Sequence, residues 1–212
     1  MKGLKRSLIY WGYLIEKYFF TMIVTMIGMG IIMSMMNRKS ELEMVALYMP
    51  MMGIIFMMSQ AMSNAHYNIP QALSFGATRR EILIGMQIFT HVATLQTILL
   101  TLLGVTYLPN PTELEAIKLF QIYAVLLLFS CGAGNGICAA TMRYGNKIGV
   151  SVYMFFIILM IFLAVGIVIS GFADLRNALV AFCGWGAIAA VILDIIMIGV
   201  CSKVIKNYEV RV

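Results

Sequence analysis

Residues 148–170 read IGVSVYMFFIILMIFLAVGIVIS, a run of 23 residues without one charged side chain. A helix that crosses the hydrocarbon core of a bilayer needs about 20 such residues. The whole chain has the same character, since 62% of its 212 residues are hydrophobic, 11% are charged and the mean hydropathy is +0.94. Soluble domains are roughly 45–50% apolar and about 25% charged. The sequence therefore predicts an integral membrane protein and excludes a soluble, disordered or disulfide-stapled one.

Six apolar runs follow one another along the chain, with short polar connections between them. This pattern predicts an all-α membrane protein with six transmembrane helices in one domain, residues 1–212. The first run is too long, and too poor in a small-residue cleavage site, for a secretory signal peptide. The runs cover residues 18–36, 44–63, 85–108, 119–140, 148–170 and 178–202.

Lysine and arginine lie mainly on one side of these runs. The N-terminus, the second and fourth connections and the C-terminus together carry eleven of the 15 Lys and Arg residues, and the other connections carry four. Because cytoplasmic flanks are enriched in these residues, we expect both termini in the cytoplasm. The net charge of +6 thus comes from short flanks, so no basic face for nucleic acid is expected.

An amphipathic segment over residues 3–16 precedes the first run. Its apolar side chains recur at helical spacing, with basic residues off that stripe. We expect this segment to form a separate helix in the cytoplasmic interface before the chain turns into the first span. A simple basic anchor that fixes the topology is the alternative. The stripe consists of Leu4, Leu8, Trp11 and Ile15.

The connection between the second and third runs, residues 64–84, reads NAHYNIPQALSFGATRREILI. Pro70 suits the first turn of a short helix, and Gly76 suits its end. Thr78, followed three residues later by Glu81, has the spacing of a capping box for the next helix. The sequence therefore predicts a short helix along the cytoplasmic surface, followed by exposed arginines. An ordinary turn with topology-setting arginines is the alternative.

Residues 72–85, ALSFGATRREILIG, resemble the cytoplasmic segment of ABC-2-type transporter permeases. Those chains have an interfacial N-terminal helix, six spans and a coupling helix between spans 2 and 3. The resemblance implies that residues 71–75 dock into a cleft of a separate ABC ATPase subunit, with residues 78–81 at that contact. The ATPase-coupling residues that it implies are Gln71, Ala72, Leu73, Ser74, Phe75, Gly76, Thr78, Arg79, Arg80 and Glu81.

By this resemblance the chain would be the permease subunit of an ATP-driven exporter in a bacterial plasma membrane. One six-span bundle offers one wall of a path, so a second copy or a paralogue is expected to face it in the lipid bilayer. The chain lacks a GxxxxGK[ST] motif, so no cofactor is expected on it, and ATP and Mg²⁺ would be bound by the partner ATPase. Small bacterial members of the family often export peptides or drugs, and an amphipathic substrate of that kind is the expectation.

Polar side chains inside the apolar runs are candidates for the lining of a translocation path. Those on the third run fall within about a third of the helix circumference, and hydrogen bonding that merely holds the bundle together is the alternative. Asp194 is the only acidic residue well inside a run, and its depth is close to that of His91, so we hypothesise that the two pair. Gly132 and Gly136 have the spacing of close helix packing, within the chain or across a dimer. The candidate path residues are Gln87, Thr90, His91, Thr94, Thr97, Thr101 and Asp194.

Catalysis has little support in the sequence. There is no HExxH motif or Cys/His cluster, and His66 and His91 are the only histidines. The four cysteines fall inside or at the end of apolar runs and are interpreted as small packing residues, so neither a catalytic nor a metal-binding residue is predicted. Two other functions stay open: a membrane scaffold or immunity protein without an ATPase, and a vitamin-capture subunit of an importer.

Overall fold

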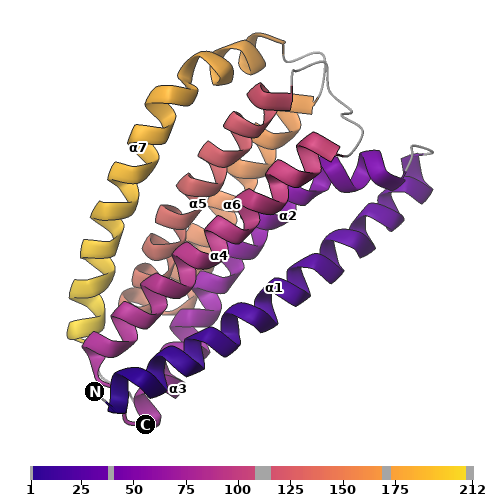
Figure 1. Cartoon of the computed structure of the whole chain (residues 1–212). Helices are drawn as coiled ribbons and strands as arrows, with labels where there is room; N and C mark the ends of the chain where they lie inside the picture. Colours follow the sequence, from indigo (N-terminus) through magenta and orange to yellow (C-terminus); the bar gives the residue numbers. More distant parts are fainter. Residues whose placement is uncertain (1, 38–40, 108–115, 169–172, 209–212) are drawn as a thin grey trace.

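The computed structural model describes residues 2–37, 41–107, 116–168 and 173–208, and almost all of these residues are helical. Figure 1 shows the long helices running up and down one bundle, with the start of α1, the short helix α3 and the end of α7 at the same end. In chain order the elements are α1 (Lys2–Asn37), α2 (Glu41–Ser63), the π-helix η1 (Asn64–Asn68), α3 (Ile69–Ser74), α4 (Arg79–Tyr107), α5 (Ala116–Tyr144), α6 (Asn146–Val168) and α7 (Ala173–Lys206).

Three helices of the described chain are long and apolar enough to cross a membrane. They cover Arg79–Tyr107, Ile117–Tyr144 and Cys183–Lys206, and their mean hydropathies are 1.7, 1.7 and 2.4. A spanning helix needs about 20 residues, and each of the three is longer. This finding fits the membrane protein that the composition predicts.

The first helix differs from the expectation. Lys2–Asn37 form one continuous helix, so the predicted turn between an interfacial helix over residues 3–16 and a first span is absent. Gly12 is the one glycine near that expected turn, the helix continues through it, and no proline stands there to break the helix. The Trp11 side chain, expected at the level of lipid headgroups, is instead 1% exposed and packs on Phe89 of α4. Gly85 makes this contact possible, because a Cβ at that position would collide with the indole ring.

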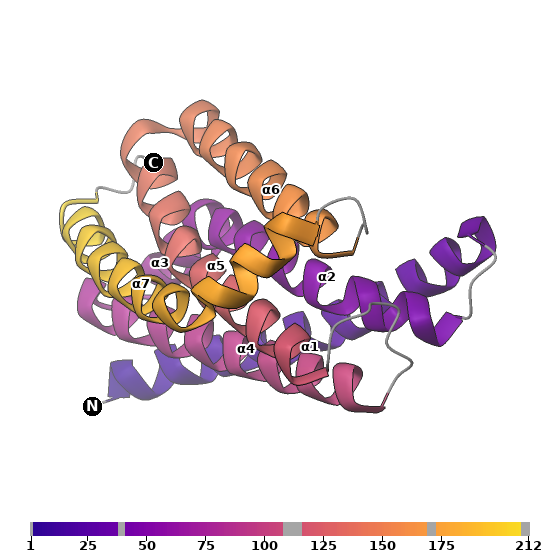
Figure 2. The same cartoon turned by 90° about the horizontal axis from the view of Figure 1, so that it is seen from above.

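Helix α5 lies at the centre of the bundle and packs against α2, α4, α6 and α7 (Figure 2). The most apolar part of α5 is 72% buried, whereas the corresponding parts of α4 and α7 are 33% and 17% buried. Helices α4 and α7 therefore pack on α5 with one side and leave much of their apolar surface uncovered.

Glycines on α5 set how closely α7 approaches. A Cβ on Gly132 would lie 3.0 Å from the backbone N and Cα of Asp194, and a Cβ on Gly136 would lie 3.2 Å from Sδ of Met197. Gly134 faces the other side, where a Cβ would lie 3.5 Å from Cβ of Ala61 on α2. The close helix packing that the sequence predicted at Gly132 and Gly136 therefore takes place within the chain, against α7.

We predict that Gly132→Ala destabilises the fold, because the new methyl group meets backbone atoms of α7 that cannot rotate away. Overpacking of this kind costs about 1–3 kcal/mol. Gly199→Ala is the matched control, since a Cβ there has nothing within 4 Å. Removal of a helical glycine should leave the stability of that variant unchanged or raise it by about 0.5–1 kcal/mol. Thermal unfolding in detergent measures both, and equal stability of the two variants would contradict the packing described.

Candidate functional site

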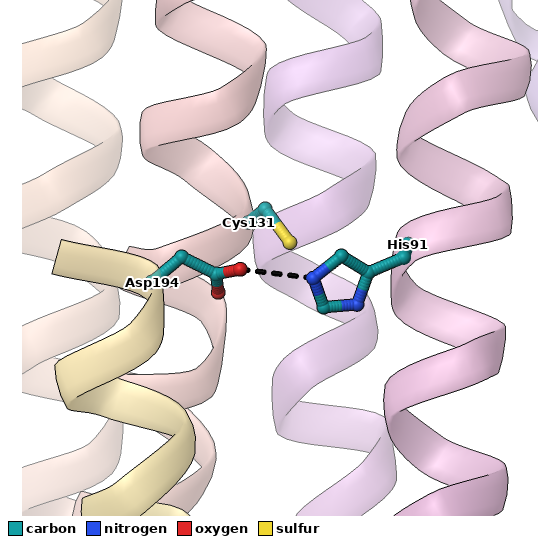
Figure 3. Close-up of side chains that lie close together, drawn as sticks. All are labelled: His91, Cys131 and Asp194. Atoms are coloured by element: carbon teal, nitrogen blue, oxygen red, sulfur yellow. Dashed lines mark hydrogen bonds and ion pairs between the residues drawn. The ribbon is translucent and has the colours of Figure 1, made fainter. Parts of the chain in front are cut away.

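Four polar side chains from three helices meet inside the bundle and form a polar network. His91 of α4 and Asp194 of α7 pair directly, with 2.9 Å between Nε2 and Oδ2 (Figure 3). Nδ2 of Asn135 on α5 donates to Oδ1 of Asp194 at 2.9 Å. Nε2 of Gln87 on α4 donates to Oδ1 of Asn135, also at 2.9 Å. The pairing hypothesised for His91 and Asp194 is thus present, and further polar contacts surround it.

Both ring nitrogens of His91 face hydrogen-bond acceptors. Nδ1 lies 2.7 Å from the backbone oxygen of Gln87, so Nδ1 carries a hydrogen and donates it. A second proton must lie between Nε2 and the Asp194 carboxyl group to form the bond seen there. Whether this proton sits on His91 or on Asp194, the net charge of the His91–Asp194 pair is zero. Neutrality suits apolar surroundings, in which an isolated charge would be costly.

The polar network is buried on one side and open on the other. The Asn135 residue is 2% exposed, whereas the side chains of Asp194 and His91 are 15% and 48% exposed. Sequence reasoning did not select Asn135. It is the only amide well inside the fourth apolar run, so the rule that selected Asp194 could have found it.

The polar stripe on α4 does not form one lining surface in the structure. Thr94, Thr97 and Thr101 are buried, and their hydroxyl groups donate at 2.8 Å to backbone oxygens four residues earlier in the same helix. Thr97 also packs toward α2, where its methyl group fills the space left by Gly53. A threonine that bonds its own helix can be buried without a polar partner elsewhere. These three residues therefore pack between helices, and only Gln87 and His91 reach the polar network.

Residues 64–84, the candidate coupling segment, have the local structure that their turn residues predict. Helix α3 begins at Ile69 with Pro70 in its first turn. It ends in a Schellman motif: the Ala77 N–H donates to the Ala72 oxygen and the Gly76 N–H to the Leu73 oxygen. Gly76 has a φ of 79°, which glycine adopts at little cost.

The capping box at the start of α4 is also present. The Thr78 backbone N–H and hydroxyl group both donate to Oε2 of Glu81 at 2.9 Å, and the Glu81 N–H donates back to the Thr78 hydroxyl oxygen at 3.3 Å. The bond from the Thr78 backbone N–H is the main cause that lowers the pKa of Glu81 below its usual value. The capping box thus satisfies backbone donors at the start of α4.

Hydrogen bonds to three other parts of the chain hold the coupling segment in place. The Tyr10 hydroxyl group of α1 donates to Oε1 of Gln71 at 3.1 Å, and burial raises the pKa of this tyrosine, so its proton stays on the oxygen. His66 pairs with Asn146 at the start of α6, with 3.0 Å between Nε2 and Oδ1. Nη2 of Arg79 donates to the Tyr208 backbone oxygen, just beyond α7, at 2.8 Å. The segment, which runs into α4, is thus connected to α1, to the start of α6 and to the chain just beyond α7.

The coupling residues implied by the sequence divide into exposed and anchoring ones. Ala72 is 2% exposed and Leu73 is partly buried, so these two hold α3 on the bundle. Glu81 is partly buried and belongs to the capping box. Phe75, 65% exposed, stands at the end of α3 with its ring near that of Tyr10. The exposed residues are Gln71, Ser74, Phe75, Gly76, Thr78, Arg79 and Arg80.

Comparisons of the chain with protein-family models, with curated proteins and with solved structures found no match. Two features of the described chain remain to suggest a function. The polar network can hold a proton, or another cation, between α4 and α7. The coupling segment exposes an aromatic ring and two arginine side chains, those of Phe75, Arg79 and Arg80.

We predict that Asp194→Asn is tolerated better than Asp194→Ala. An asparagine can donate to Nε2 of His91 and accept from Asn135, so every hydrogen bond of the neutral pair keeps a counterpart. Alanine removes the partner of His91 Nε2 and leaves Nδ2 of the buried Asn135 with only a 3.4 Å hydrogen bond to Oε1 of Gln87, and a poorly satisfied buried group costs about 1–3 kcal/mol. Thermal unfolding in detergent should place Asp194→Asn within about 1 kcal/mol of the unsubstituted chain. Equal loss in both variants would show that the fold requires the carboxyl group itself.

Proposed function

We propose that this chain is the membrane subunit of an ATP-driven exporter of the ABC-2 type, with six transmembrane helices and both termini in the cytoplasm. The observation that carries the proposal is the coupling segment. The segment contains a short helix between two long ones, exposes the aromatic Phe75 and the cationic Arg80, and is anchored to α1, to the start of α6 and to the chain just beyond α7. Movement of such a segment is passed on to the whole bundle.

The chemistry of the exposed residues fits a protein partner. Aromatic and arginine side chains are enriched among residues that dominate binding at protein interfaces. Phe75 and Arg80 are both exposed on the coupling segment. An ATPase subunit would receive Phe75 in an apolar pocket and the arginines at an acidic rim. ATP and Mg²⁺ would be bound there, since the sequence of this chain has no phosphate-binding loop.

Export would need a second copy or a paralogue. Helix α7 leaves most of its apolar surface uncovered within the chain, as expected for a helix that contacts lipid or another subunit. In the proposed mechanism ATP binding draws two ATPase subunits together and moves the two coupling segments with them. The long helices then reorient and open the path outward. A peptide, a drug or another amphipathic molecule is the proposed substrate class.

The first test is purification of the tagged chain from its native membrane in a mild detergent, with mass spectrometry of the proteins that accompany it. The proposal expects an ATP-binding subunit in stoichiometric amount. A chain that purifies alone, or with partners lacking nucleotide-binding motifs, would contradict the proposal and favour the scaffold or immunity function. A bound vitamin without an ATPase would favour the capture subunit.

Two substitutions locate the contact. We predict that Phe75→Ala and Arg80→Glu each reduce the recovered ATPase more than tenfold, because loss of an interface anchor costs about 2 kcal/mol or more. Arg79 is less suitable for substitution, because its guanidinium group also donates a hydrogen bond to the Tyr208 backbone oxygen. Lys147→Glu is the matched control, a charge reversal at an exposed residue near the start of α6. Full recovery of the ATPase with both coupling-segment variants would contradict the proposed docking site.

A further inference from the structure

Cys131 of α5 lies beside the His91–Asp194 pair (Figure 3). One ring nitrogen of His91, Sγ of Cys131 and one carboxylate oxygen of Asp194 all lie within 4.8 Å of one another. Imidazole nitrogen, thiolate sulfur and carboxylate oxygen are the donors that bind zinc in proteins. We propose that His91, Cys131 and Asp194 form a zinc-binding site between α4, α5 and α7. The sequence assigned Cys131 only a packing role, because nothing in the spacing of the three residues brings them together.

Hydrogen bonds around the cluster already orient its donor atoms. A histidine that binds a metal through one nitrogen usually donates the other N–H to a backbone carbonyl or a carboxylate. Nδ1 of His91 does so toward the Gln87 oxygen at 2.7 Å, which directs Nε2 at Asp194 and Cys131. Nδ2 of Asn135 donates to Oδ1 of Asp194, so Oδ2, the oxygen that faces His91, is the one placed to bind an ion. Asn135 is therefore a positioning residue of the site.

Charge balance favours a divalent ion in these apolar surroundings. Binding of Zn²⁺ displaces the proton shared by His91 and Asp194 and the proton of the Cys131 thiol, so two protons leave as one ion enters. The product contains a neutral imidazole, a carboxylate, a thiolate and Zn²⁺, with a net charge of zero. The cluster is neutral before and after binding, which avoids an uncompensated charge inside the bundle.

The donor atoms must move to hold an ion, because they are separated by up to 4.8 Å and the longest of these separations has to shorten by about one ångström. Donors about 2.0–2.3 Å from one tetrahedral zinc ion stand about 3.3–3.7 Å apart. The His91–Asp194 distance of 2.9 Å must therefore widen by about half an ångström once the shared proton has left. The His91 side chain is 48% exposed and has room to move. Cys131 is only 3% exposed, so the residues packed around it restrict its movement. Three protein donors leave a fourth position on the exposed side for water or another ligand.

Cobalt is the probe for this site, because Co²⁺ replaces zinc and its spectrum reports the donor set. The chain is purified with an affinity tag that lacks histidine, and Co²⁺ is titrated in detergent. We expect one ion per chain, visible bands of a tetrahedral ion, a near-ultraviolet band from thiolate to Co²⁺, and loss of these bands on addition of one equivalent of Zn²⁺. No saturable binding at micromolar Co²⁺ would overturn the proposal.

Matched variants locate the ion. Cys131→Ser should abolish the thiolate band, Asp194→Asn should weaken binding at least tenfold while keeping the fold, and Asn135→Ala should weaken it about 10- to 100-fold through lost orientation. Cys138→Ser on the same helix and His66→Asn should leave the titration unchanged. Binding that survives both Cys131→Ser and Asp194→Asn would overturn the proposed site. The titration uses the chain alone, so its outcome is independent of whether an ATPase accompanies the protein.

Discussion

The close approach of α5 and α7 at Gly132 is the contact on which the polar network depends. With no side chain at this position, the α7 backbone comes near enough for the Asp194 carboxyl group to reach Asn135 on α5 and His91 on α4. A larger residue would separate the helices and leave a carboxyl group without partners in apolar surroundings. The same glycine therefore governs the packing of the bundle and the geometry of its most polar site.

Much of the local structure could be predicted because local signals determine it. Pro70 has a fixed φ that suits a first helical turn, Gly76 can adopt the positive φ of a helix end, and the Thr78 and Glu81 side chains cap the next helix. Together they specify a short helix, a sharp end and a capped start. Asp194 was found by another rule: a carboxyl group among apolar residues needs a partner at similar depth. The apolar runs predicted a membrane protein, and three of the described helices meet its requirements of length and hydropathy.

The rest depends on which helix faces meet, and one sequence does not contain that information. Periodicity placed the threonines of α4 on one face but could not show that their hydroxyl groups bond their own helix. Trp11 is a residue type common at membrane interfaces. Its burial is explained by Gly85, which has no side chain where the indole ring lies. No sequence pattern marked Cys131 as a candidate site residue, because its place in the proposed site depends on His91 and Asp194, which lie on other helices.

The burial of Trp11 gives the chain an optical reporter of its own. The sequence has two tryptophans, and the other, Trp185 on α7, is 73% exposed on the apolar outer surface. Replacement of Trp185 by phenylalanine would leave a single indole, which lies between α1 and α4 directly beside Tyr10, the residue that binds the coupling segment. Its emission wavelength would shift when water reaches that junction. Fluorescence could thus follow the junction without an attached dye.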